Sequence, residues 1–296
     1  MKVFVTGATG FIGSVIVQEL IAAGHQVIGL ARSEANATAL LAAGAEVHRG
    51  DLQNLDSLRS GVAKAEGVIH AGFIHDFTRF AEMCEVDRLA IEAMGEELLG
   101  SDRPFVVTSG TAIVSPGKLA TEDIIPAPGG HPRKSEEAAD ALAAKGVRVS
   151  VVRLSPSVHG DGDVIGFVPL LIRIAGEKGV AAYIGEGNNR WTALHKSDAA
   201  VLFRLALENA VSRTRFHGVA EESIDFKVIA EMIGKKLNIP VVSVSREEAP
   251  AHFGWFTGFA GIDCPASSSL TQERLNWHPQ GIKLLDDMEN GTYFKS

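Results

Sequence analysis

The segment Thr6-Gly7-Ala8-Thr9-Gly10-Phe11-Ile12-Gly13 decides the fold of this 296-residue chain. It lies between an apolar run typical of a strand, 2–5, and a stretch with helical spacing, 12–23. In such a loop the first glycine permits a tight turn, the second lets the backbone approach a pyrophosphate, and the third permits close helix-on-strand packing. The free N–H groups at the helix start favour negative charge. This context predicts a dinucleotide-binding loop whose contacts come from Gly7, Thr9, Gly10, Phe11, Ile12 and Gly13.

The first half of the chain continues this alternation of strand and helix. Further strands are predicted at 26–31, 45–48, 67–70, 105–108 and 147–154. Helices are predicted between them at 35–43, 55–62, 77–99 and 133–145. Gly24, Gly44 and Gly146 follow three of the predicted helices, where a left-handed C-cap favours glycine. The pattern predicts an α/β fold with a Rossmann-type, doubly wound parallel sheet.

The pattern changes after about Pro156. Glycine and polar residues become frequent, and helices are expected at 164–178, 197–209, 226–237 and 283–290. We expect residues 1–158 to form an NADP-binding Rossmann domain, with a return segment at about 191–215. Residues 159–296 are expected to form mainly a smaller, C-terminal substrate-binding lid.

The end of the second strand indicates the cofactor. An NAD-binding chain usually carries an acidic residue about twenty residues after the glycine loop, where it binds the ribose 2′-hydroxyl. Here the sequence reads Leu30-Ala31-Arg32-Ser33. No carboxylate stands there to repel a 2′-phosphate, and Arg32 and Ser33 can both hydrogen-bond one. The residues predict NADP(H); the alternative is that Arg32 is simply a solvated loop residue.

Two other strand ends are expected to contact the cofactor. Asp51 and Leu52 follow the third strand, where a carboxylate can accept a hydrogen bond from the adenine amino group. Asp51 as a helix N-cap is the alternative. Ala71 and Gly72 follow the fourth strand, and such small residues permit close approach of a cofactor to the backbone.

The composition of the chain argues against several classes of partner. A net charge of −8 with no basic cluster argues against a nucleic-acid partner. Cys84 and Cys264 lie far apart and lack His or Cys neighbours at metal-ligand spacing, which indicates no metal site and a reducing compartment. No apolar run is long enough to span a bilayer, and the chain begins directly with a strand. These features predict a cytoplasmic protein that acts on a small-molecule substrate.

These segments together resemble the short-chain dehydrogenase/reductase superfamily, in its extended, epimerase/dehydratase-like branch. The resemblance covers nearly the whole chain and runs through TGATGFIG at 6–13, Gly50-Asp51-Leu52, VIHAG at 68–72, VVTSGT at 106–111, VRLSPSVHGDGD at 152–163 and RWTALHKSDAA at 190–200. It implies that Pro156 and Val158 line a nicotinamide pocket, and that His195 and Asp198 stabilise the return to the main domain. It also implies a homodimer formed through helices such as 77–99.

The chain departs from this superfamily at its active site. The usual catalytic pair is a Tyr followed four residues later by a Lys, yet neither Tyr183 nor Tyr293 is followed by Lys at that spacing. The equivalent segment reads His131-Pro132-Arg133-Lys134-Ser135-Glu136. The sequence therefore resembles an atypical subgroup that keeps the cofactor site and lacks the standard acid.

Other side chains are candidates for the missing acid. Thr111 and Ser109 follow the fifth strand at the edge where ligands bind. His131 is a possible proton donor and Lys134 a possible ribose contact, although both also suit a solvated loop or helix start. Substrate contacts are expected from His75, His159 and Trp255, for which core packing or a place at the rim is the alternative.

The leading hypothesis is an NADPH-dependent oxidoreductase that reduces a small carbonyl or an activated double bond. One alternative is a catalytically silent protein that senses NADP(H). A second is a sugar-nucleotide epimerase or dehydratase, which is disfavoured because the Tyr–Lys pair is missing. The fold alone does not separate these functions.

Overall fold

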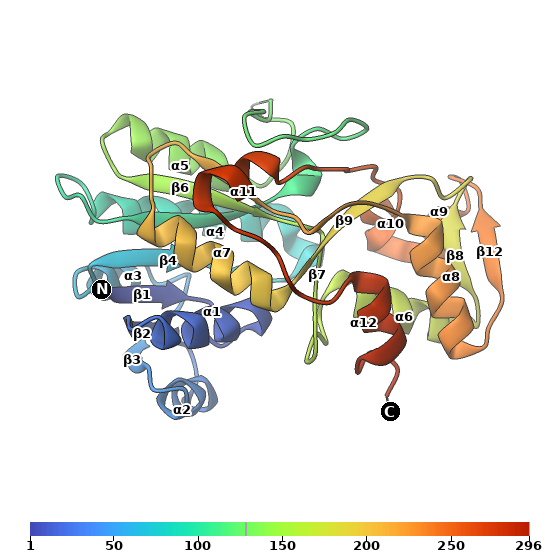
Figure 1. The fold of residues 1–296 in the computed structure, drawn as a ribbon, viewed down its shortest axis with the longest axis horizontal. Helices are drawn as coiled ribbons and strands as arrows, with labels where there is room; N and C mark the ends of the chain where they lie inside the picture. The colour runs from blue at the N-terminus through green and yellow to red at the C-terminus, as the bar shows by residue number, and fades with distance from the viewer. Residues whose placement is uncertain (128, 296) are drawn as a thin grey trace.

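A seven-stranded parallel sheet forms the larger part of the molecule (Figure 1). The computed structural model describes residues 1–127 and 129–295, and in it the strands follow the order β10-β6-β5-β4-β1-β2-β3. Neighbouring strands are parallel throughout. The predicted doubly wound Rossmann-type sheet is therefore confirmed. Its strands are β1 (Lys2–Thr6), β2 (Gln26–Ala31), β3 (Glu46–Arg49), β4 (Gly67–His70), β5 (Phe105–Gly110), β6 (Val149–Leu154) and β10 (Arg215–Gly218).

Helices cover both faces of this sheet, which is why its strands are apolar on both sides. Val3 and Val5 of β1 belong to one buried cluster, and Phe4 between them belongs to another. The first cluster includes side chains of α1 (Phe11–Ala22), α2 (Glu34–Ala42) and α7 (Lys196–Glu208). The second includes side chains of α3 (Leu55–Val62), α4 (Phe80–Glu96) and α5 (Ser135–Ala144).

The helix ends follow the predicted chemistry. Gly24, Gly44 and Gly146 have φ angles of 85°, 84° and 92°, so the left-handed conformations expected after three helices are present. The predicted helix 77–99 was too long. Its first turn is the 3₁₀-helix η1 (Phe77–Arg79), and α4 ends at Glu96.

The C-terminal half forms a smaller body around its own apolar core and two short sheets (Figure 1). Sequence patterning did not predict these sheets, whose strands pair with partners far away in the sequence. They comprise β7 (Ser157–His159), β8 (Ala181–Ile184), β9 (Arg190–His195), β11 (Glu221–Asp225) and β12 (Val241–Val244). The helices are α6 (Phe167–Lys178), α8 (Phe226–Leu237), α9 (Ala249–Phe253), η3 (Gly254–Phe256), α10 (Thr257–Ala260) and α12 (Leu284–Asn290).

Two segments of this half return to the main sheet. Helix α7 packs on α1, and β10 adds the outer strand beside β6. Helix α11 (Ser269–Leu275) then lies against β10. Within residues 1–127 and 129–295, no helix is both long and apolar enough to cross a bilayer.

Candidate functional site

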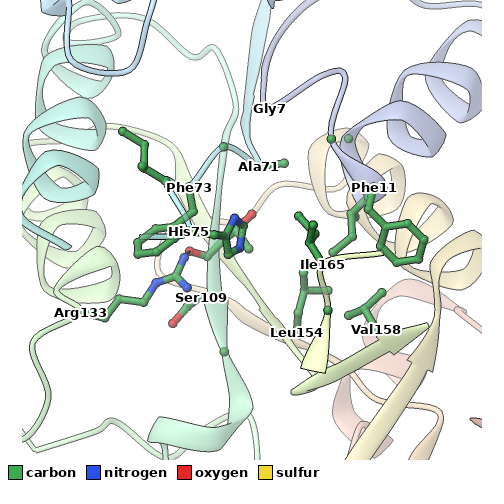
Figure 2. Close-up of a pocket in the computed structure, with 18 of the residues that line it drawn as sticks. Gly7, Phe11, Ala71, Phe73, His75, Ser109, Arg133, Leu154, Val158 and Ile165 are labelled. Carbon is green, nitrogen blue, oxygen red and sulfur yellow. Dashed lines mark hydrogen bonds between the residues drawn. The ribbon is translucent and has the colours of Figure 1, made fainter. Parts of the chain in front are cut away.

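A cavity of about 550 Å³ lies at the carboxyl ends of the main-sheet strands (Figure 2). The opposite wall comes from the C-terminal half, through Ile165, Phe167 and Phe259. Ligands of open α/β sheets bind at this edge, so the cavity is the candidate functional site. It is bordered by every predicted cofactor residue except Ser33, namely Gly7, Thr9, Gly10, Phe11, Ile12, Gly13, Arg32, Asp51, Leu52, Ala71, Gly72, Pro156 and Val158.

The glycine loop has a geometry that its neighbours enforce. Gly7 has a φ of 66°, and a Cβ there would lie 2.6 Å from the carbonyl oxygen of Ala71. A Cβ on Gly13 would lie 1.9 Å from the carbonyl oxygen of Gly7. Helix α1 starts after Gly10 with no side-chain cap and no acidic residue in its first turn. The helix start therefore suits a bound pyrophosphate.

Arg32 and Asp51 stand at one end of the cavity. The Arg32 side chain is 72% exposed, and its Nε lies 3.8 Å from Oδ2 of Asp51. Asn36 also borders this end and was not among the predicted residues. The hydroxyl of Ser33 instead accepts a hydrogen bond from the backbone N–H of Asn36 and so caps α2. Ser33 therefore supports the helix that carries Asn36 and does not border the cavity.

A polar cluster occupies the other end, with Arg133 at its centre (Figure 2). The guanidinium of Arg133 lies 4.7 Å from the ring centroid of Phe73. Its Nε donates to the hydroxyl of Ser135 at 2.9 Å, and its Nη2 donates to the carbonyl oxygen of Thr108 at 3.0 Å. Ser109 also borders the cavity, and its buried hydroxyl has no hydrogen-bond partner among the described residues. A buried hydroxyl without a partner fits a site that a ligand completes.

Two histidines join this cluster. His75 and His131 both border the cavity, and their rings lie 5.5 Å and 5.6 Å from those of Phe73 and Phe80. Partial burial, and after it the charge of Arg133, lower the pKa of His131. The His131 imidazole is therefore neutral at pH 7 and can donate a hydrogen bond through its N–H group.

Besides Ser33, four predicted site residues do not border the cavity. Thr111 is buried, and its hydroxyl donates to the carbonyl oxygen of Leu154. Lys134 borders a separate groove between α4 and α5. His159 is buried against Asp287, 2.8 Å away. Trp255 stands behind the cavity wall, with its ring stacked on Phe77 at 4.5 Å.

A buried hydrogen-bonded chain links the two ends of the cavity. Thr6 accepts from the backbone N–H of Gly72 and contacts Nδ1 of His70 at 2.7 Å. His70 Nε2 lies 3.1 Å from Oδ1 of Asp87, whose Oδ2 accepts from Ser135 at 2.5 Å. Burial alone would raise the pKa of Asp87, but the hydrogen bonds and the charge of Arg133 outweigh it and lower that pKa. The chain therefore holds Ser135, and through it Arg133, in place.

Arg133 and Asp163 were not predicted to have a role in the site, although they lie in the segments 131–136 and 152–163 that were compared with the superfamily. The Tyr–Lys spacing of the superfamily favoured Lys134 as a candidate. In the structure α5 begins only at Ser135, and it is Arg133 that borders the cavity. Asp163 borders the cavity and accepts hydrogen bonds from the backbone N–H of Gly166 and from the Tyr293 hydroxyl. Burial raises its pKa.

Residues 3–118 match the model of the NAD dependent epimerase/dehydratase family. Proteins of Schizosaccharomyces pombe and Saccharomyces cerevisiae, both described as uncharacterized, are 51% and 46% identical over 99% and 97% of this chain. The matches cover 100% and 98% of their own lengths. A 2-alkyl-3-oxoalkanoate reductase of Stenotrophomonas maltophilia is 28% identical over 70% of this chain and 66% of its own length.

Solved structures share the fold over 99% of this chain, and two of them illustrate the likeness. One is DesIV, a dTDP-glucose 4,6-dehydratase from Streptomyces venezuelae with NAD and TYD bound, with a TM-score of 0.78, 19% identity and 96% coverage of its chain. The other is MoeE5 in complex with UDP-glucose and NAD, with a TM-score of 0.75, 22% identity and 98% coverage. At these identities the likeness supports the fold alone.

Proposed function

The chain belongs to the NAD dependent epimerase/dehydratase family, within the short-chain dehydrogenase/reductase superfamily, and from that premise we propose that it is an NADPH-dependent oxidoreductase reducing a small carbonyl or an activated double bond. One observation carries the proposal. A single cavity connects the glycine loop to a polar cluster that contains Arg133 and the unpartnered Ser109 hydroxyl. The part of the cavity beside the glycine loop would hold the cofactor, and the part beside the polar cluster would face the substrate.

The cofactor residues support NADP(H). The uncapped start of α1 would hold the pyrophosphate, and Arg32 with Asn36 would hold the 2′-phosphate. Bound there, NADPH would supply a hydride. We further propose that residues 1–158, with the return segment, hold the cofactor and that the C-terminal half closes the substrate side.

The chain's own residues supply the rest of the chemistry. The guanidinium of Arg133 would bind a polar or negatively charged group of the substrate. The Ser109 hydroxyl would relay a proton from solvent water to the reacting substrate oxygen, accepting one proton as it donates another, either directly or through a water that it holds. The N–H group of neutral His131 would donate a hydrogen bond to the same oxygen and keep its proton. Thr111 and Lys134 take no part in this proposal because neither borders the cavity.

The position of the tyrosines disfavours a sugar-nucleotide epimerase. Tyr183 and Tyr293 do not border the cavity, and the Tyr293 hydroxyl donates to Asp163. Epimerases and dehydratases of this branch generally depend on a Tyr–Lys pair facing the cofactor. The segment in which that pair would stand contributes His131 and Arg133 to the cavity wall here.

The test combines cofactor binding with turnover. NADPH and NADH are titrated into the purified protein by calorimetry, and NADPH oxidation is then followed with a panel of small aldehydes, ketones and enones. We expect tighter binding of NADPH and turnover with at least one compound. Failure to bind either cofactor overturns the proposal. Tight NADPH binding with no turnover on the panel favours the cofactor-sensing alternative instead.

A further inference from the structure

The substrate side of the cavity has an aromatic wall. Five phenylalanines border it: Phe73, Phe77, Phe80, Phe167 and Phe259. Their rings form one connected series, with centroids 6.2 Å apart for Phe73 and Phe80, 5.8 Å for Phe77 and Phe80, 6.0 Å for Phe77 and Phe259, and 4.9 Å for Phe167 and Phe259. The series spans both halves of the molecule. Such a wall suits a flat, apolar molecule.

At one end of this wall lies the positively charged side chain of Arg133, which has no ion-pair partner among the described residues. Arg133 lies over Phe73, at the beginning of the aromatic series. Two of its five N–H groups are used, by Ser135 and Thr108. It forms no ion pair with any residue in 1–127 or 129–295, and the nearby Asp87 is already bonded to His70 and Ser135. The remaining N–H groups match the fork of a carboxylate.

The opposite wall is unsuited to a nucleoside diphosphate. The residues that the C-terminal half contributes to the cavity are Asp163, Ile165, Gly166, Phe167 and Phe259. Among the described lining residues the only arginines or lysines are Arg32 and Arg133, at opposite ends. With Arg32 beside the cofactor loop, a substrate diphosphate would face an apolar wall and a carboxylate.

We propose that the substrate is a flat, largely apolar carbonyl compound that carries a carboxylate. The carboxylate binds Arg133, and the apolar body lies along the phenylalanine series. This inference rests on the proposed function and names the substrate class for the same site. The proposed substrate is thus a much smaller acid than a sugar nucleotide.

The experiment measures binding without turnover. The protein is saturated with NADP⁺ and titrated by calorimetry with trans-cinnamate, with its neutral isostere trans-cinnamamide, and with UDP-glucose. Cinnamate should bind at least tenfold more tightly than the amide, because only the anion gains charge-assisted hydrogen bonds from Arg133. UDP-glucose should bind more weakly than cinnamate. Binding should also change the fluorescence of Trp255, which is stacked on Phe77, and Trp255→Phe should remove that signal.

Two arginine variants provide the matched comparison. Arg133→Gln should weaken cinnamate by roughly ten- to a hundred-fold, to the level of the amide, and leave NADPH affinity unchanged. Arg32→Gln should do the reverse. Arg133→Lys keeps the charge without the planar fork and should give an intermediate affinity, so it serves if the glutamine variant misfolds.

The inference is overturned by equal affinities for the acid and the amide, by cinnamate binding that survives loss of Arg133, or by tighter binding of UDP-glucose. These outcomes are separate from failure of the proposed function. A chain that binds cinnamate through Arg133 and does not bind NADPH would contradict only the oxidoreductase.

Discussion

Arg32 is the residue on which the choice of cofactor depends. It is the cation at the end of β2, and its partner Asp51 is 3.8 Å away, so a 2′-phosphate can compete for it. We expect Arg32→Ala to weaken NADPH binding by roughly ten- to a hundred-fold and to leave NADH almost unchanged. Calorimetric titration of both cofactors at moderate and high salt provides the measurement. Equal affinities of the parent protein for NADPH and NADH would contradict the expectation.

Two hydroxyls at the carboxyl end of β5, those of Ser109 and Thr111, should behave differently. Ser109 borders the cavity and its hydroxyl lacks a partner among the described residues, whereas Thr111 is buried and bonded to Leu154. Ser109→Ala should lower turnover by about a hundred-fold if its hydroxyl carries the proton. Thr111→Val should keep a near-parent rate. Steady-state kinetics on an active carbonyl compound test both, and a larger loss in the threonine variant would reverse the assignment.

At the scale of elements, substitutions at two glycines of the loop before α1 should affect folding and cofactor binding differently. Gly10 has a φ of −74°, which any residue adopts, and a Cβ there would meet only the carbonyl oxygen of Gly7, at 3.2 Å. Gly10→Val should therefore fold, with a smaller loss of Tm than Gly13→Val, and lose both cofactors, because the branch occupies the space of the pyrophosphate. Gly13→Val should lower the Tm itself, since its Cβ would lie 1.9 Å from that oxygen. Thermal unfolding and calorimetry distinguish the two; parent-like binding by the Gly10 variant would remove the loop from the site.

The elements that sequence predicted well are those with a strong local signal. β2, β4, α3 and α8 lie where patterning placed them, because an apolar run or a helical spacing is bounded by a glycine, a polar cap or a charged turn. The glycine loop was predicted equally well from the sequence. The position of Arg133 was not, since it depends on where α5 starts and on a hydrogen bond to Thr108, 25 residues earlier in the sequence. The short strands of the C-terminal half likewise form only through distant pairing.

At the scale of the whole molecule, a buried polar cluster joins the main sheet to the last quarter of the chain. Arg153 on β6 is fully buried and donates to Glu136 at 2.7 Å and 2.8 Å. His217 on β10 lies between Arg153, 3.1 Å from its Nε2, and the carbonyl oxygen of Ser267, 2.8 Å from its Nδ1. The returning segment is therefore attached to the sheet by bonds that need a neutral imidazole. That requirement makes the attachment sensitive to pH.

Burial, together with the charge of Arg153, lowers the pKa of His217 to about 4. The unfolded chain, with a histidine pKa near 6.5, then binds more protons than the folded chain between about pH 6.5 and pH 4. The stabilisation by neutral His217 is complete above pH 6.5, falls as the pH drops through this window, and changes little below it. Between pH 7 and pH 5.5 this residue alone should cost about 1 kcal/mol of unfolding free energy.

Urea unfolding at several pH values tests this expectation against His217→Asn. The variant should be less stable at pH 7, by about 1–3 kcal/mol, because Arg153 loses an acceptor. Its stability should also depend less on pH, since the asparagine does not titrate. His75, His131, His159 and His252 also have lowered pKa values and contribute in the same direction in both proteins, so the difference between the two curves isolates His217. Parallel curves would mean that His217 titrates alike in the folded and unfolded protein, and they would overturn the expectation.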